Sequence, residues 1–107
     1  METPKLNTTY DFEFSDGSSV KMTLTFYALY QLKSRDKSLY DRYNRAMNAI
    51  GTGKGDELDS ITLLYIAYVC ANQSEENLMS EEEFIIKCGC DREAVGKAAK
   101  ALTSAKN

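Results

Sequence analysis

The sequence predicts an α+β domain that is mostly α: an N-terminal β-hairpin followed by four or five packed helices. Three observations lead to this prediction. Apolar residues alternate with polar ones near the N-terminus, they then recur every three or four positions, and glycines or helix-capping residues interrupt the helical pattern. With 107 residues, 43% of them hydrophobic, the chain has the size and composition of one folded domain spanning residues 1–107.

The hairpin is predicted over about residues 8–24, where two runs of alternating residues flank a turn. The turn is the SDGSS segment at 15–19, in which Gly17 can adopt the positive φ that a hairpin needs. Two strands alone are marginally stable, so their apolar face must pack on helices of this chain or on another copy, and both alternatives are open. The apolar members are Tyr10, Phe12 and Phe14 in the first run and Val20, Met22 and Leu24 in the second.

Helical spacing begins at Thr25 and predicts a helical region over about residues 25–50. Phe26, Leu29 and Tyr30 start the apolar pattern, which continues from residue 39 to residue 50. Asp36 leaves two alternatives: it can cap a second helix, or one long helix can run through it. The GTGKG segment at 51–55 then ends the helical region.

Three further helices are predicted over about residues 57–72, 81–88 and 92–104. Asp56, Ser80 and Asp91 are their predicted N-caps, with Ser80 and Glu83 forming a capping box. The helix at 57–72 is apolar on nearly every side, from Leu58 onward, which predicts a central helix that is buried on several sides.

Charge is modest and unevenly placed. The net charge of −3 divides into seven basic against six acidic residues in the first 50 positions and six against ten in the rest. This balance favours solvated helix faces and argues against a nucleic-acid partner, which calls for a strongly basic surface. A more specific alternative is self-association, in which the basic stripe around residues 33–45 of one copy contacts the acidic stripe around residues 75–83 of another.

No catalytic, metal or cofactor site is predicted. Histidine is absent, and Cys70, Cys88 and Cys90 are too few for a structural zinc site and do not suggest a disulfide framework. The GTGKG segment lacks the first glycine and the final Ser or Thr of a phosphate-binding loop. The longest apolar stretch, residues 61–71, is too short to span a membrane, and no signal peptide is recognisable. We therefore expect a non-enzymatic, cytosolic, protein-binding domain.

Tyrosines are the most unusual part of the composition, with seven in the chain and no tryptophan. Core packing with hydroxyls at the rim accounts for most of them. The functional alternative is a tyrosine-rich groove for a partner's apolar helix, since tyrosine is enriched at interfaces. The candidate partner-binding residues form three pairs, each spaced by three positions: Tyr27 and Tyr30, Tyr40 and Tyr43, and Tyr65 and Tyr68.

The order of several segments resembles a known family. These segments are LTFYALYQLKS at 24–34, LYDRYN at 39–44, DELDSITLLY at 56–65, AYVCAN at 67–72 and MSEEEF at 79–84. Together they are similar to the tail assembly chaperones of long-tailed bacteriophages and of prophages in Gram-positive bacteria. The resemblance implies a small helical protein of the host cytoplasm that binds the tape measure protein, and in some members the tail tube protein, and is absent from the mature virion.

The resemblance also implies a longer form made by programmed frameshifting in several members. Ala105-Lys106-Asn107 can be encoded by a sequence that contains a slippery heptamer, so we hypothesise that this chain is the unshifted form. Codons that do not allow slippage would contradict this hypothesis.

Two other functions are alternatives: a connector or neck component of the phage particle, and a host-directed regulator that acts on nucleic acid, which the net negative charge disfavours.

Overall fold

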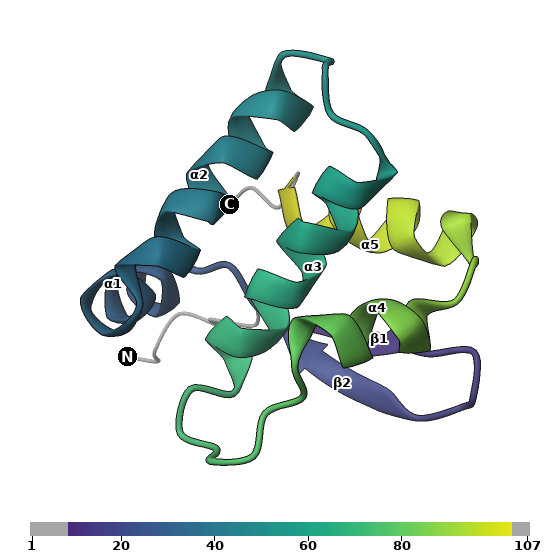
Figure 1. Cartoon of the computed structure of the whole chain (residues 1–107), viewed down its shortest axis with the longest axis horizontal. Helices are drawn as coiled ribbons and strands as arrows, with labels where there is room; N and C mark the ends of the chain where they lie inside the picture. Colours follow the sequence, from purple (N-terminus) through teal and green to yellow (C-terminus); the bar gives the residue numbers. More distant parts are fainter. Residues whose placement is uncertain (1–8, 104–107) are drawn as a thin grey trace, which may run out of the picture.

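The computed structural model describes residues 9–103 and confirms the predicted class, a two-stranded antiparallel hairpin followed by five helices. Central helix α3 separates the other elements into two groups (Figure 1). The predicted hairpin start at residue 8, the helix end at residue 104 and the segment 105–107 lie outside the described residues. No helix among residues 9–103 is long and apolar enough to cross a membrane. The elements are β1 (Tyr10–Glu13), β2 (Ser19–Met22), α1 (Phe26–Arg35), α2 (Lys37–Gly51), α3 (Glu57–Ala71), α4 (Glu81–Cys88) and α5 (Arg92–Thr103).

The hairpin forms at the predicted turn. Gly17 has φ of 91°, and its N–H donates to the carbonyl of Phe14, while the N–H of Phe14 donates to the carbonyl of Ser18 at 2.8 Å. Glycine suits this position because side chains disfavour a positive φ. The strands then pair with Tyr10 opposite Met22 and Phe12 opposite Val20.

The aromatic face of the hairpin packs within the chain. Phe12, Phe14 and Met22 are buried in one cluster with residues of α3, α4 and α5. At its centre is Phe84 of α4, which is fully buried and lies edge-on to Phe14, with ring centroids 5.6 Å apart. This packing resolves the alternative between helices of the same chain and strands of another copy, because the face is already covered.

The second cluster lies on the other side of α3. There α1 and α2 pack on Ile66 and Cys70, while Leu64 and Ala67 of the same helix face the first cluster. Helix α3 contacts every other helix and β2, which confirms its predicted central position. Its nearly continuous apolar surface is therefore explained by burial on two sides.

The region 25–50 is two helices. Asp36 ends α1, since its N–H donates to the carbonyl of Leu32 at 2.7 Å. It also begins α2, because its carboxylate accepts from the N–H of Leu39 at 3.1 Å. One residue thus satisfies backbone groups of both helices, and the chain changes direction at its extended backbone, with φ of −150°.

The later helices begin at their predicted caps. The side chains of Ser80 and Asp91 accept from backbone N–H groups three residues further on, each at 3.1 Å. The reciprocal capping box lies at α3: Asp56 and Asp59 each accept from the other's backbone N–H at 3.0 Å. The prediction therefore had the right cap residues and placed the reciprocal box one helix too late.

Candidate protein-interaction surface

The largest exposed aromatic surface is the first turn of α1, at the end of the molecule far from α4 (Figure 1). We define the α1 aromatic patch as Phe26, Tyr27 and Tyr30, whose exposed fractions are 90%, 67% and 67%. At about 100° per residue these three positions fall within one arc of about 100°. The opposite face of α1 is buried in the second cluster, so the fold directs the patch outward.

The patch is held in place by its own helix. Thr25 caps α1, with its hydroxyl accepting from the N–H of Ala28 at 3.2 Å. The rings of Tyr27 and Tyr30 stack with centroids 6.2 Å apart and planes at 24°. Aromatic side chains ordered in this way offer a large contact area at a small cost in conformational entropy. Contiguous exposed apolar surface of this kind often marks an interaction site.

Tyr40 and Tyr43 form the second predicted pair and lie at the edge of the second cluster. Their rings stack with centroids 6.0 Å apart, and each residue is half-buried. The ammonium of Lys33 lies 5.4 Å from the ring centroid of Tyr40, a cation–π contact between α1 and α2. Burial raises the pKa of Tyr43. This pair therefore supports helix packing and keeps a partly accessible edge.

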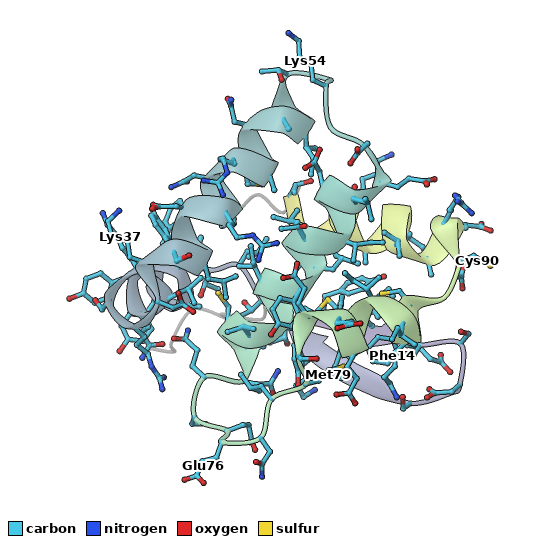
Figure 2. The ribbon with its side chains drawn as sticks, in the orientation of Figure 1. Phe14, Lys37, Lys54, Glu76, Met79 and Cys90 are labelled. Atoms are coloured by element: carbon cyan, nitrogen blue, oxygen red, sulfur yellow. The ribbon has the colours of Figure 1, made fainter. Side chains whose placement is uncertain are left out.

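The third predicted pair is Tyr65 and Tyr68, whose hydroxyls form hydrogen bonds within the chain. Both hydroxyls bond to the backbone of Met79, in the segment between α3 and α4 (Figure 2). The hydroxyl of Tyr65 donates to the Met79 carbonyl at 3.1 Å, and that of Tyr68 accepts from the Met79 N–H at 2.9 Å. Tyr68 is only 7% exposed and stacks on Phe84, so it offers a partner almost no surface in this conformation.

A second apolar surface lies where α3, α4 and α5 meet. Leu58 and Ile86 are 62% and 70% exposed. Leu58 lines an apolar groove of about 250 Å³ together with Ile85 and Val95, among others. Leu58 was predicted to face inward, and that prediction was wrong. It lies in the first turn of α3, which extends past the two clusters that bury the rest of the helix.

Oppositely charged side chains of the two predicted stripes meet within the chain. Arg42 of α2 binds Glu81 of α4 through two hydrogen bonds of 2.8 and 2.7 Å, and this pairing lowers the pKa of Glu81. Arg35 donates to the carbonyl of Gln73 at 2.8 Å. Part of the complementarity that suggested self-association is thus used in holding the start of α4 and the loop before it against α2 and α1.

Two of the three cysteines are buried and one is exposed. Cys70 and Cys88 are buried, and burial raises their pKa values to about 12 and about 11, so both remain protonated thiols near neutral pH. Cys90 is exposed between α4 and α5 (Figure 2). Across residues 9–103 there is no group of three or more Cys, Asp or Glu side chains placed to hold a metal ion.

Sequence reasoning missed the most exposed aromatic residue. Phe26, Leu29 and Tyr30 have helical spacing, and the pattern alone placed them together on the apolar side of the helix. In the structure Leu29 is buried, whereas Phe26 and Tyr30 point to solvent. Helical spacing alone does not separate the two groups, because Leu29 has the same spacing to the exposed Phe26 as to the buried Leu32.

Comparison of the chain with family models, with curated proteins and with solved structures gives no match.

Proposed function

We propose that this protein is a tail assembly chaperone of a long-tailed bacteriophage or prophage. In this proposal it binds the tape measure protein in the host cytoplasm, keeps it soluble until the tail tube polymerises, and is absent from the mature virion. The tail tube protein is a second proposed client. The proposal joins the resemblance carried by segments between residues 24 and 84 to one structural observation, the α1 aromatic patch.

The patch supports the proposal because it is an apolar surface that the fold leaves uncovered. Phe26 and Tyr30 are one helical turn apart, the spacing at which a helix presents two adjacent anchors to a partner helix. Burying a ring of this size contributes about 2 kcal/mol. Two or three such rings give a weak single site, which is the strength suited to many copies binding along one client by avidity.

The charge of the chain supports the same function. The family resemblance implies a client that is long, helical and apolar, which aggregates when exposed. Each bound copy would add a net charge of −3 to the complex while its aromatic patch covers apolar client surface. Higher net charge of one sign favours solubility, so coating by this chain would keep the client dispersed.

Co-expression with the tape measure protein of the same phage or prophage tests the proposal. Wild-type chain is expected to keep the client in the soluble fraction and to co-purify with it. Replacing Phe26 and Tyr30 together by serine is expected to weaken binding by at least about tenfold, with unchanged helical circular dichroism because both side chains are exposed.

The matched control is Ile86→Ser, which removes a side chain of similar exposure from α4 and is expected to leave client binding unchanged. Composition of purified particles separates the proposal from the connector alternative. Finding this chain in stoichiometric amounts in virions, or a client that stays equally soluble without it, would overturn the chaperone assignment.

A further inference from the structure

The two outer edges of the hairpin differ in whether other elements hydrogen-bond to their backbone. The bond from the Phe14 N–H to the Ser18 carbonyl sets the ladder, so Phe12 with Val20 and Tyr10 with Met22 are the hydrogen-bonded pairs. In an antiparallel ladder the residues between such pairs direct their N–H and C=O groups away from the partner strand. On β1 these are Asp11 and Glu13.

The outer edge of β2 is covered by α3. The N–H of Thr23, just after β2, donates to the carbonyl of Ala67 at 3.0 Å. The carbonyl of Lys21 accepts from the side-chain amide of Asn72 at 3.2 Å. A helix and its C-cap residue thus take the place of a third strand on that side, and further strands cannot pair there.

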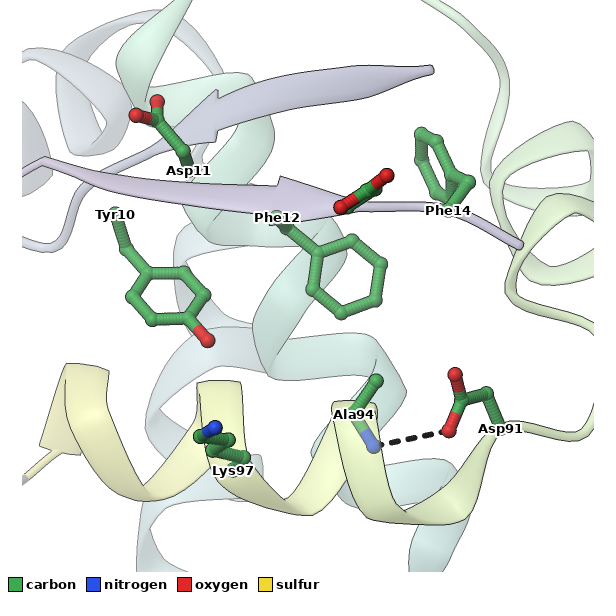
Figure 3. Close-up of a pocket in the computed structure, with 8 residues that line it drawn as sticks. Tyr10, Asp11, Phe12, Phe14, Asp91, Ala94 and Lys97 are labelled. Atoms are coloured by element: carbon green, nitrogen blue, oxygen red, sulfur yellow. Dashed lines mark hydrogen bonds between the residues drawn. The ribbon is translucent and has the colours of Figure 1, made fainter. Parts of the chain in front are cut away.

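The outer edge of β1 is open. Within residues 9–103 no hydrogen bond reaches the backbone groups that Asp11 and Glu13 direct outward. Beside this edge lies a depression of about 360 Å³ between β1 and α5 (Figure 3). Tyr10 and Phe12 extend from the strand toward α5, where the small side chain of Ala94 leaves room. Unpaired strand edges are templates for another strand.

The acidic side chains on β1 favour a partner strand with basic residues. Asp11 and Glu13 lie on the solvent-exposed face of the hairpin. The carboxylate of Asp11 pairs with the ammonium of Lys21 at 3.1 Å, whereas Glu13 has no ion pair within residues 9–103. Antiparallel pairing with β1 of a second copy would set acidic side chains against acidic side chains, which is destabilising. Lysine or arginine at those positions would instead form favourable cross-strand pairs.

We propose that the outer edge of β1 binds an extended segment of a partner protein as a third strand. Alternate residues of that segment are basic and lie beside Asp11 and Glu13. The residues between them are apolar and lie in the depression beside Tyr10 and Ala94. This interaction is separate from the α1 aromatic patch and does not depend on the proposed chaperone function.

A fluorescein-labelled peptide of alternating lysine and valine tests the proposal by anisotropy titration of the full-length chain. Saturable binding is expected, weakened by salt because it uses exposed charges. The same peptide N-methylated at its lysines, whose amides would face Asp11 and Glu13, is expected to bind at least about tenfold more weakly. Equal binding of the methylated peptide, or no binding of either peptide, would overturn strand addition.

Charge reversal in the protein gives a matched pair of variants. Glu13→Lys is expected to weaken peptide binding about fivefold, whereas Glu76→Lys, with the same charge change in the loop after α3 (Figure 2), should stay within about twofold of wild type. Both side chains are exposed, so neither substitution disturbs the packing of the core. Equal weakening by the two variants would indicate attraction to net charge alone and would contradict a site at β1.

Hydrogen exchange locates the site directly. The amides of Asp11 and Glu13 should exchange rapidly in the free chain and at least about tenfold more slowly at saturating peptide. Protection elsewhere without protection of these two amides would refute the assignment. Sedimentation at the same concentrations completes the test, since a dimer that the peptide dissociates would make a second copy, rather than a basic strand, the natural occupant.

Discussion

Replacing Tyr68 by phenylalanine removes one hydroxyl from the core and keeps the ring that stacks on Phe84. The lost group accepts the Met79 N–H at 2.9 Å. Because Tyr68 is 7% exposed, water has little access to the donor that remains. A net hydrogen bond contributes about 1 kcal/mol, and leaving a buried partner unsatisfied raises the cost, so we expect a loss of about 1.5 kcal/mol in the free energy of unfolding.

Tyr65→Phe is the matched comparison, since it removes a hydroxyl that bonds to the same residue. Its bond to the Met79 carbonyl is longer, at 3.1 Å, and Tyr65 is half-buried. Water can therefore replace the lost donor, and the expected cost is about 0.5 kcal/mol. The two substitutions preserve ring volume, so a difference between them reports the hydrogen bonds and their burial.

Urea unfolding followed by circular dichroism measures both variants, since the chain has no tryptophan for fluorescence. With an m-value of about 1.5 kcal/mol per M, Tyr68→Phe should lower the midpoint by about 1 M and Tyr65→Phe by about 0.3 M. A Tyr68→Phe midpoint within about 0.2 M of wild type would refute the structural account of this residue. If a Tyr68 variant of unchanged stability bound the client more weakly, Tyr68 would instead belong to the partner-binding surface.

Three other expected outcomes follow from the packing and the charges. Phe84→Ala, at the centre of the first cluster, should cost about 3–5 kcal/mol in urea unfolding. Asp36→Ala removes the cap of α2 and should cost about 1 kcal/mol, measured the same way, with Asp36→Asn close to wild type. Arg42 lowers the pKa of Glu81 below its ordinary value of 4.5, so this pair stabilises the fold above that pH and the effect is lost as pH falls through the folded-state pKa. The stability gap between wild type and Glu81→Gln, followed from pH 7 downward, should therefore close in acid, and a constant gap would contradict the pairing.

Local pattern predicted the elements of this protein well. Alternation located the hairpin because a strand exposes successive side chains to opposite faces, and Gly17 marked its turn. Asp56, Ser80 and Asp91 located three helix starts because a side-chain acceptor at that position satisfies a backbone donor left free by the helix. Each of these signals acts over a few residues and needs no knowledge of the rest of the fold.

The faces of the helices were harder to predict because burial depends on what lies opposite. Helical spacing is equally satisfied by Leu29, which is buried, and by Phe26, which is exposed. Leu58 continues the apolar surface of α3, yet its side chain stays 62% exposed beside the groove between α3, α4 and α5. The candidate binding surface therefore could not be separated from the core by periodicity alone.

Sequence by itself determined that this chain forms a hairpin and a set of helices with one apolar helix at the centre. Tertiary structure alone decided that Tyr68 serves the core while Tyr27 and Tyr30 face solvent, and that α3 covers one edge of the hairpin and, within residues 9–103, leaves the other open. The physical reason is the range of the interactions. Capping and strand alternation act between neighbours in the chain, whereas the accessibility of a ring or a strand edge depends on residues brought close only by folding.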